Sequence, residues 1–448
     1  MRAVIANLSI EDTITLLNNK YDSIDESGSF FAIVATEYDS DNNVTADFFD
    51  VIFAGTQIGY DYVNTIVFPT AHYQNATFID NLKYVVWLCK NHGKLLFNKD
   101  AIREKHIWKD VEWGKREKNY SPKGKDPGNV WIPTEDDGHA KITNHILLDD
   151  EGVLARLVKM IDSEDYEVSG AFVNSIYSPP IKHDASKKEK VPSAQGRVIF
   201  GTSENMSLIE DNSVKVVVTS PPYWNLKDYF KKGQIGQESY DTYLLRMRSV
   251  WQQCFNKLQA DGSLWININS RVSNDNVILI PRDFIAMCKE IGFYYKGIIV
   301  WHKSSGIPTG DKNIVDRHEY VLVFSKNCRF ELNQQQLLSF CDYCNPVMNG
   351  GAIWNINRKA GSVGKKYKHP AIYPNELVSR IVSVASSVSD TILDPFLGSG
   401  TTLISALSNG RNCVGYEFNE GFKELILSRL ESDGVDKTAV VFVNQNAK

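Results

Sequence analysis

The second half of the chain alternates short apolar runs with longer amphipathic segments. Six runs rich in β-branched and aromatic residues are typical of buried strands: 214–218, 263–268, 297–301, 320–324, 391–394 and 412–417. Between them, residues 239–258 and 375–388 repeat apolar positions at helical spacing. Strands that alternate with helices predict an α/β fold, with a mainly parallel sheet covered on both faces.

A polar, charged stretch without apolar periodicity, residues 182–197, divides the chain. Such a composition predicts an exposed linker. The sequence therefore predicts an N-terminal α/β domain at 1–181 and a second domain at 198–448.

The first domain repeats features of the second. Two pairs of segments share an apolar pattern: 49–62 with 214–229, and 78–98 with 243–267. A tryptophan, a histidine and an arginine also recur at nearly equal spacing: Trp131, His145 and Arg156, then Trp354, His369 and Arg380. A tandem duplication whose first copy lost its chemistry would give these offsets. Chance similarity between short α/β segments is the alternative.

Composition narrows the class of protein. No apolar run reaches the roughly 18 residues that span a bilayer, and acidic residues at positions 11 and 12 come too early for a signal peptide. Seven cysteines in 448 residues fit a reducing compartment. The pair Cys341 and Cys344 lacks a second close pair, so no metal site is expected. We expect a cytoplasmic protein with no membrane contact.

Charge is unevenly distributed along the chain. The net charge is −5, and residues 1–181 hold 28 Asp and Glu against 17 Lys and Arg, or −11. Residues 300–368 hold ten Lys and Arg against five Asp and Glu, or +5. This second region permits contact with a polyanion.

A glycine-rich turn, DPFLGSGTT at 394–402, follows a predicted strand and precedes an apolar helical stretch. Gly398 and Gly400 allow a tight turn and a close approach of a ligand to the backbone. Asp394 would repel a phosphate but attract an ammonium group, and Glu417 is placed to accept hydrogen bonds from ribose hydroxyls. A ligand with a ribose and a cationic amino-acid head fits, which describes S-adenosylmethionine. A purely structural turn is the alternative.

A second turn, TSPPYW at 219–224, also follows a predicted strand. Its two prolines fix two φ angles and remove two donors, which makes a stiff corner with outward carbonyls. Ser220 adds a hydroxyl, and Tyr223 and Trp224 add aromatic faces. This combination suits a flat ring that bears an amino group; a rigid turn with packed aromatic residues is the alternative.

Together, these two strings resemble the catalytic and cofactor motifs of bacterial DNA amino-methyltransferases, which methylate an exocyclic nitrogen of cytosine or adenine. The catalytic motif comes first, as in the circularly permuted β class. Five further strings resemble family segments in the expected order, from about residue 198 to about 430: DGSLWININ, GIIVWHKSSGIP, RHEYVLVFSK, KHPAIYPNELVSRIV and GRNCVGYE.

The resemblance implies a Rossmann-like, mainly parallel, seven-stranded sheet in residues 198–448, with S-adenosyl-L-methionine as cofactor. The cofactor residues that it implies are Asp394, Phe396, Gly398, Gly400, Glu417, His369 and Pro370. The catalytic residues that it implies are Ser220, Pro221, Pro222 and Tyr223. Serine in the first catalytic position is found more often with cytosine N4 methylation, and aspartate with adenine N6.

The expected chemistry is direct methyl transfer to an amino group. Hydrogen bonds to Ser220 and to the Pro221 carbonyl would draw the nitrogen toward a tetrahedral state. In double-stranded DNA the target base would flip out and stack on Tyr223, with Trp224 beside it. The chain has no Pro-Cys pair, which cytosine C5 methylation would use.

Two regions complete the predicted site. The family often has an acidic residue before the catalytic strand, where this chain has Thr202, so we expect weaker cofactor binding there. Target recognition is expected at about 303–368, with phosphate contacts from Lys303, Arg358, Lys359, Lys365 and Lys366.

The sequence thus predicts a site-specific cytosine-N4 DNA methyltransferase of a restriction-modification system. Adenine N6 methylation, a non-catalytic DNA-binding subunit and an RNA or protein methyltransferase are the alternatives. A monomer and a homodimer are both compatible with the sequence.

Overall fold

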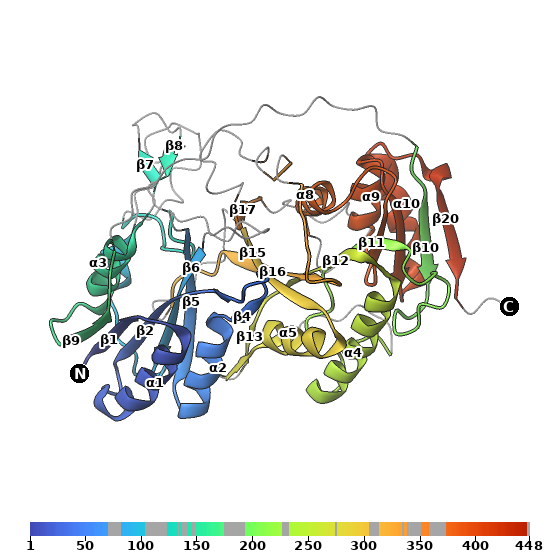
Figure 1. Ribbon diagram of the computed structural model, residues 1–448. Helices are drawn as coiled ribbons and strands as arrows, with labels where there is room; N and C mark the ends of the chain where they lie inside the picture. Colours follow the sequence, from blue (N-terminus) through green and yellow to red (C-terminus); the bar gives the residue numbers. More distant parts are fainter. Residues whose placement is uncertain are drawn as a thin grey trace.

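The computed structural model describes most of the chain as two α/β units that lie side by side (Figure 1). The described residues are 1–69, 82–103, 123–132, 134–136, 142–145, 148–173, 193–225, 233–273, 276–303, 313–333, 336–337, 340, 351–357 and 373–445. Of 134–136 and 142–145 only the backbone is described.

The C-terminal unit is built on a nine-stranded sheet. Its order is β17 (Ile353–Asn355), β15 (Tyr294–His302), β16 (His318–Ser325), β12 (Leu258–Ile268), β11 (Val214–Thr219), β18 (Thr391–Asp394), β19 (Asn412–Glu417), β10 (Gly196–Phe200) and β20 (Val440–Asn444). Only β16 runs antiparallel to its neighbours. The six strands predicted from the sequence are all present, and the mainly parallel α/β sheet is confirmed. The expected seven strands are extended by one short strand at each edge, β17 and β20.

Helices cover both faces of this sheet. They are α4 (Tyr240–Lys257), α5 (Ile280–Ile291), α8 (Asn375–Ala385), α9 (Thr401–Ser408) and α10 (Lys423–Ser432). Helices α4 and α5 lie together below the sheet in Figure 1, and α8 and α9 pack together above it. Local signals set the helix ends: Ser239 caps α4 through the Thr242 amide, and Gly292, with a φ of 116°, ends α5.

The N-terminal unit has a five-stranded sheet. Its order is β5 (Asp61–Pro69), β6 (Leu82–Cys89), β2 (Ser29–Ala35), β1 (Ala3–Asn7) and β9 (Tyr166–Gly170), with helices α1 (Ile10–Lys20), α2 (Phe48–Ile58) and α3 (Asp150–Ile161).

Three small hairpins in the two units complete the described strands: β3 (Glu37–Tyr38) with β4 (Val44–Ala46), β7 (Thr134–Asp136) with β8 (Ile142–His145), and β13 (Arg271–Ser273) with β14 (Asn276–Ile278). Short 3₁₀ helices span Tyr21–Ser23, Lys99–Ile102, Glu420–Phe422 and Lys437–Ala439.

The N-terminal sheet repeats the topology of half of the larger one. In both units two strands are parallel to a central strand, β2 and β9 to β1, and β12 and β18 to β11. In both, the next strand is antiparallel, β6 in one and β16 in the other, and the strand after it, β5 or β15, returns to the original direction. The three helices and the first hairpin follow the same order along the chain in both units, whereas the β7–β8 hairpin stands where the described residues of the other unit have the single strand β17.

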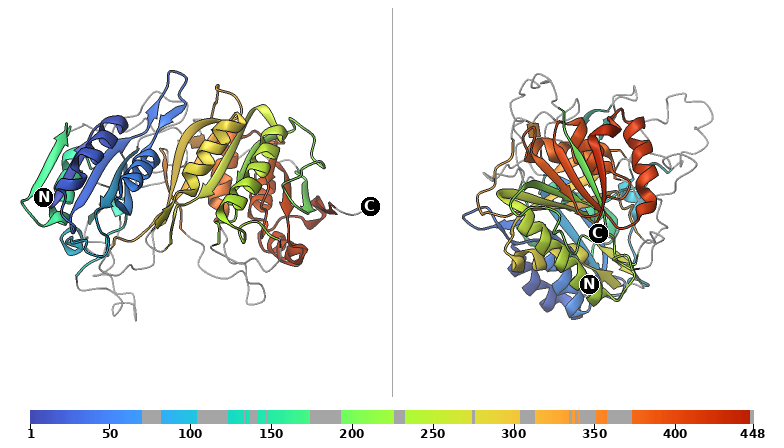
Figure 2. Two further views of the ribbon diagram at one scale, coloured as in Figure 1. Left: turned by 90° about the horizontal axis from the view of Figure 1, so that it is seen from below. Right: turned by 90° about the vertical axis from the view of Figure 1, so that its right-hand side faces the viewer.

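The two units pack reciprocally. The hairpin strand β4 lies against β15 of the other unit, and its counterpart β14 lies against β5. Seen from below in Figure 2, α1, α2, α5 and α4 form one row, with the equivalent helices α2 and α5 at its centre. Contacts of this kind, in which element i of one unit touches element j of the other and the reverse also holds, are typical of two similar subunits related by a two-fold axis.

Buried polar and aromatic groups seal the contact between the units. The Tyr295 hydroxyl of β15 donates to the Asp47 carboxylate at 3.0 Å, and the buried Lys296 ammonium donates to Asn43 at 2.6 Å. Phe49 of α2 packs edge-on against Tyr320 of β16, with ring centroids 5.4 Å apart. The buried apolar residues around these groups form one continuous core that spans both units. Within this core the polar groups are shielded from water, which strengthens their hydrogen bonds.

The predicted pairing of segments is only partly right. Residues 49–62 form α2 and the start of β5, not a counterpart of strand β11, and 82–89 form strand β6, not a counterpart of helix α4. Short apolar runs have the same composition in buried helices and strands, so their pattern alone does not align them. The tryptophan and arginine residues that recur at nearly equal spacing do occupy equivalent positions in the two units. Trp131 lies beside β5 as Trp354 lies beside β15, and Arg156 and Arg380 occupy α3 and α8.

Two predicted boundaries differ from the structure. Gly196 and Arg197, assigned to the linker, belong to strand β10, and residues 182–192 lie outside the described residues. The predicted recognition region at 303–368 contains strands β16 and β17 of the central sheet. None of the helices that the structure describes is long and apolar enough to cross a membrane.

The contact between the units predicts a pH-dependent stability. Burial, followed by the neighbouring charge of Asp50, raises the pKa of Asp47 from 3.8 to about 7. The folded protein therefore holds this proton more tightly than the unfolded chain, and the stability that Asp47 contributes is full below pH 4 and lost as the pH rises to 7. Asp47→Asn keeps the helix cap but cannot ionise. Its free energy of unfolding, relative to the original protein, should rise by up to about 4 kcal/mol between pH 4 and pH 7 in urea titrations.

A second uncharged cap, Asp47→Ser, serves as the control for packing. Both variants should show the same trend with pH although their absolute stabilities differ. A stability difference that stays constant between pH 4 and 7 would contradict a buried, protonated Asp47.

Candidate functional site

The two predicted motifs meet at the centre of the larger sheet. The 220–223 turn follows the carboxyl end of β11, and the glycine turn follows that of the adjacent strand β18. From β11 the chain continues through α4 to β12 on one side, and from β18 through α9 to β19 on the other. Such a point, where the strand order reverses, opens a crevice at the carboxyl ends of the strands and is the usual ligand site of α/β sheets.

Asp394 joins the two turns. Its carboxylate is fully buried and accepts hydrogen bonds from the Thr219 hydroxyl at 2.7 Å, the Phe396 amide at 2.9 Å and the Tyr373 hydroxyl at 3.2 Å. The Thr402 hydroxyl is a fourth donor, at 2.5 Å. Burial raises the pKa of Asp394, although these hydrogen bonds oppose the shift. The predicted contact of Asp394 with a ligand ammonium would require one of these donors to move.

The glycine turn has the backbone that only glycine adopts readily. Gly398 and Gly400 have φ values of 54° and 85°, and Gly400 caps the start of α9. The Arg429 guanidinium, which is 4% exposed, fixes the turn from below, with hydrogen bonds to the Ser399 carbonyl at 2.9 Å and the Thr401 hydroxyl at 2.9 Å. The shape of the turn is thus held before any ligand binds.

Two further predicted cofactor residues lie at the ends of the next strands. Glu417 ends β19, is 8% exposed, and accepts hydrogen bonds from the amides of Gly398 at 2.8 Å and Asn419 at 2.7 Å. Thr202 follows β10, which pairs directly with β19. Its hydroxyl donates to Glu204 at 2.9 Å, so an acid does lie beside Thr202, two residues later than the motif places it.

The predicted catalytic turn is held by tyrosines. The Tyr243 hydroxyl of α4 donates to the Pro222 carbonyl at 2.8 Å, and the Tyr223 hydroxyl donates to Glu319 at 2.9 Å. Among the described residues, no hydrogen bond reaches the Pro221 carbonyl. Ser220 is half-buried, and its hydroxyl oxygen lies 3.5 Å from the Asn267 side-chain amide.

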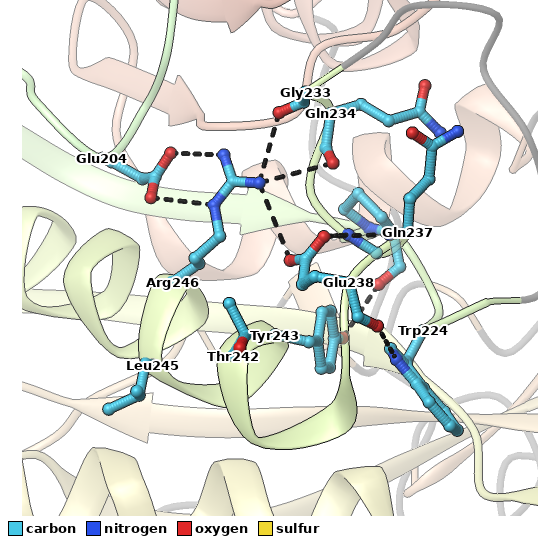
Figure 3. Close-up of polar contacts among 12 residues, drawn as sticks. Glu204, Trp224, Gly233, Gln234, Gln237, Glu238, Thr242, Tyr243, Leu245 and Arg246 are labelled. Carbon is cyan, nitrogen blue, oxygen red and sulfur yellow. Dashed lines mark hydrogen bonds and ion pairs between the residues drawn. The ribbon is translucent and has the colours of Figure 1, made fainter.

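Arg246 connects the Thr202 side of the site to the segment after the catalytic turn (Figure 3). It pairs with both oxygens of Glu204, at 3.0 and 2.6 Å, and donates to the carbonyls of Gly233 and Gln234. Hydrogen bonds from Arg246 outweigh burial and lower the pKa of Glu204. The Glu238 carbonyl of the same segment accepts a hydrogen bond from the Trp224 indole at 2.8 Å. The Arg246 guanidinium therefore holds Glu204, on the Thr202 side, next to the segment that contacts Trp224.

The structure brings most of the predicted residues together and leaves others outside. The residues at the ends of four consecutive strands, β11, β18, β19 and β10, are the predicted catalytic tetrapeptide, Trp224, Thr202, Asp394, Phe396, Gly398, Gly400 and Glu417. His369, Pro370, Arg358, Lys359, Lys365, Lys366 and the pair Cys341 and Cys344 lie outside the described residues.

Lys303 differs from its prediction as a DNA contact. It is 4% exposed and its ammonium bonds the Glu319 carboxylate. A buried cation that is already paired with a carboxylate is not available to a phosphate.

Sequence reasoning missed the residues that support the site from below, chiefly Arg246, Tyr243, Arg429, Tyr373 and Glu319. Arg246 and Tyr243 have the spacing of ordinary helix positions, and nothing local distinguishes them. A signal existed for Glu319, because a charged residue directly before the apolar run at 320–324 is unusual at the start of a central strand.

Comparison with known proteins gives a consistent result for this half of the chain. Residues 214–428 match the family model described as DNA methylase. The Type II methyltransferase M.Cfr9I of Citrobacter freundii is 29% identical over 258 residues, which cover 50% of this chain and 84% of that protein. M.MwoI of Methanothermobacter wolfeii is 32% identical over 216 residues, 46% of this chain and 30% of that protein.

Solved structures resemble the same half. TTHA0409 from Thermus thermophilus, in complex with S-adenosyl-L-methionine, is 25% identical and covers 56% of this chain and all of its own, with a TM-score of 0.42. The PvuII DNA methyltransferase (cytosine-N4-specific) is 18% identical, covers 57% of this chain and 97% of its own, and has a TM-score of 0.43.

The link between the two turns predicts a measurable stability. Thr219→Val keeps the side-chain shape and removes the hydroxyl that donates to the buried Asp394. We expect the free energy of unfolding to fall by about 1–3 kcal/mol, because a buried charged acceptor loses a donor. The matched control is Thr438→Val, which removes a hydroxyl from the exposed Asp436. It should change stability by less than about 0.5 kcal/mol; equal effects of the two variants would argue against the link.

Proposed function

We propose that the protein transfers a methyl group from S-adenosyl-L-methionine to the exocyclic N4 of cytosine in double-stranded DNA, because residues 214–428 match the DNA methylase family model. A role in a restriction-modification system is part of this proposal, supported by the Type II methyltransferases among its relatives.

One observation carries the proposal, namely the hydrogen bond from Thr219 to Asp394. It joins the residue directly before Ser220 to the first residue of the glycine turn. An amino group held at Ser220 and a ligand held by the glycine turn would therefore occupy one crevice, as a direct transfer between them requires.

The residues present fit S-adenosyl-L-methionine. The glycine turn gives close access to its backbone, and Glu417 has a carboxylate at the end of the next strand, where the ribose hydroxyls of a nucleoside are usually bound. The turn, Glu417 and Thr202 would hold the cofactor. When bound, the cofactor would supply a methyl group on a positively charged sulfur, so that the nitrogen–carbon bond could form as the sulfur–carbon bond breaks, with a neutral thioether as the leaving group, one amino proton lost to solvent and no need for an enzyme nucleophile.

The chain's own residues would prepare the target nitrogen. The amino group of cytosine is a poor nucleophile because its lone pair is delocalised into the ring. Hydrogen bonds from that group to the Ser220 hydroxyl and the Pro221 carbonyl would favour a tetrahedral nitrogen, and the second carbonyl, at Pro222, is already occupied by Tyr243. The Tyr223 ring would stack on the flipped base, with Trp224 beside it.

The choice of base rests on the first residue of the turn. Ser220 stands where family members that act on adenine more often have aspartate, which favours cytosine N4. Adenine N6 methylation would keep the same mechanism. A non-catalytic DNA-binding subunit is the other candidate, because the Glu204 carboxylate beside Thr202 is already engaged by Arg246.

We further propose that the N-terminal unit is a duplicated copy of the catalytic half that no longer performs chemistry. The shared topology and the reciprocal packing support this origin. At the position of Thr219 in β11 this copy has Asn7 in β1, and the residues that follow are Leu8, Ser9 and Ile10 in place of Ser-Pro-Pro. The copy would serve as an internal second subunit that supports the edge of the catalytic sheet.

The proposed reaction predicts a new modified base. DNA from cells that express the protein should contain N4-methylcytosine, measured by nucleoside mass spectrometry, and Ser220→Ala should reduce the mark by at least about 100-fold, as is typical when one positioned hydrogen bond to the reacting group is lost. Ser207→Ala, on an exposed loop of the same unit, is the matched control and should leave the mark unchanged.

Other outcomes separate the candidates. N6-methyladenine that disappears with Ser220→Ala would change the base but keep the mechanism. Purified protein that binds DNA but neither binds the cofactor in calorimetry nor transfers a methyl group would favour the non-catalytic subunit.

The internal second subunit predicts the oligomeric state. Because the N-terminal copy already covers the β15 edge of the catalytic sheet, we expect light scattering to give the mass of one chain, 50.6 kDa, at micromolar concentration. A mass of twice that value would show that another face forms a dimer and would contradict the proposed role of the copy.

A further inference from the structure

A charged pair lies directly beneath the proposed catalytic turn. Glu319 is the second residue of β16, and Lys303 follows the end of the neighbouring strand β15. The Lys303 side chain is 5% exposed and the Glu319 side chain 19%. Burying two charges is costly unless every hydrogen-bonding position is used, so the other contacts of Glu319 indicate what the pair does.

The Glu319 carboxylate bonds two residues of the site. One oxygen accepts from the Tyr223 hydroxyl at 2.9 Å and from the Asn267 side-chain amide at 2.8 Å, and the other accepts from Lys303. An ionised carboxylate can only accept hydrogen bonds. It therefore fixes the direction of both the tyrosine proton and the asparagine NH₂ group.

Asn267 transmits this constraint toward Ser220. Its NH₂ group faces Glu319 and lies 3.5 Å from the Ser220 hydroxyl oxygen, while its own carbonyl oxygen is buried and accepts no hydrogen bond from the described residues. Rotation of this amide by 180° would place an acceptor against the Glu319 carboxylate, which the negative charge forbids. The charge on Glu319 thus determines which atom of Asn267 faces Ser220.

We propose that Glu319, ionised against Lys303, is a positioning residue for methyl transfer, which orients Ser220 through Asn267 and holds the Tyr223 ring in place. This inference rests on the proposed function and extends it to residues that do not touch the substrate. Lys303 maintains the charge of Glu319, and Glu319 maintains the direction of the two hydrogen bonds.

Other titratable groups around Glu319 do not replace Lys303. Burial lowers the pKa of His318 to about 4, so this neighbour is neutral at pH 7, and Asp316, which is more than half exposed, has a carboxyl group that cannot supply a positive charge. Burial alone would raise the pKa of Glu319, but the Lys303 ammonium and the hydrogen bonds from Asn267 and Tyr223 hold it below the ordinary value of 4.5. Loss of the Lys303 ammonium should therefore raise the pKa of Glu319 into the pH range in which activity is measured.

The first test replaces the carboxylate by an isosteric amide. With unmethylated plasmid DNA and labelled S-adenosyl-L-methionine, Glu319→Gln should lower kcat by about 10- to 100-fold, while KM for both substrates changes less than threefold. Glu290→Gln, which removes an exposed carboxylate paired with Arg248, is the matched control and should keep kcat within twofold. A kcat within twofold of the original for Glu319→Gln would overturn the proposal.

The second test uses the pH profile, which a merely structural role would not move. In Lys303→Met, kcat should fall toward low pH and recover as Glu319 ionises at higher pH, and this acid limb should be absent from the original protein. The double variant Lys303→Met, Glu319→Gln should lose the pH dependence and stay slow. A Lys303→Met variant that is equally slow at every pH would contradict the proposal. The pH profile of Lys303→Met can be measured even if Glu319→Gln does not fold.

A structural arm separates this proposal from the function on which it rests. Neutron crystal structures, which distinguish an NH₂ group from an amide oxygen, should show the Asn267 amide reversed in Glu319→Gln relative to the original protein, with the 220–223 backbone unchanged. The same amide orientation in both proteins would overturn the positioning role whether or not the enzyme is active. Absence of methyl transfer by the original protein, together with a reversed Asn267 amide in the variant, would contradict the proposed function and leave the positioning role standing.

Discussion

The site depends on one buried carboxylate. Asp394 is fully buried, and its oxygens accept from Thr219 on β11, Tyr373 before α8, Thr402 on α9 and the backbone of its own turn. An unsatisfied carboxylate at this depth would be strongly destabilising. The four donors therefore hold their positions together, and the proposed catalytic turn, the glycine turn and the helix between the glycine turn and β19 form one rigid piece. Arg429 and Arg246 extend this constraint to the underside of the glycine turn and to the Thr202 side.

The second constraint is the contact between the two units. Among the described residues, β17 pairs only with residues 300–302 of β15, so the rest of β15 forms a sheet edge with unpaired backbone groups unless another element covers it. Here β4 of the N-terminal unit lies against that edge, and β14 covers the equivalent edge at β5. Both edges are closed by the same kind of hairpin, so each unit completes the core of the other.

The sequence predicted the strands well because they are buried on both faces and therefore read as unbroken β-branched runs, as at 214–218 and 320–324. It also predicted the two turns, since proline and glycine act through local backbone geometry. It did not align the two similar units correctly, because α2 and β6 are both almost wholly apolar and the period of a short run is ambiguous. Nor could it place Arg246, Arg429 or Glu319, because their partners Glu204, Ser399 and Tyr223 are 42, 30 and 96 residues away in sequence and are brought near only by sheet topology.

The repeated topology has a consequence for the order of events on DNA. In the described residues, only the C-terminal unit carries the Ser220 turn and the glycine turn, so the proposed activity would give each chain one reaction centre for a duplex with two strands. With the proposed activity, one encounter modifies one strand. A palindromic target would then be released with only one of its two strands modified. The protein would have to dissociate and bind again in the reverse orientation to modify the other strand. Newly replicated DNA, which already carries one modified strand, would need a single encounter of this kind at each site.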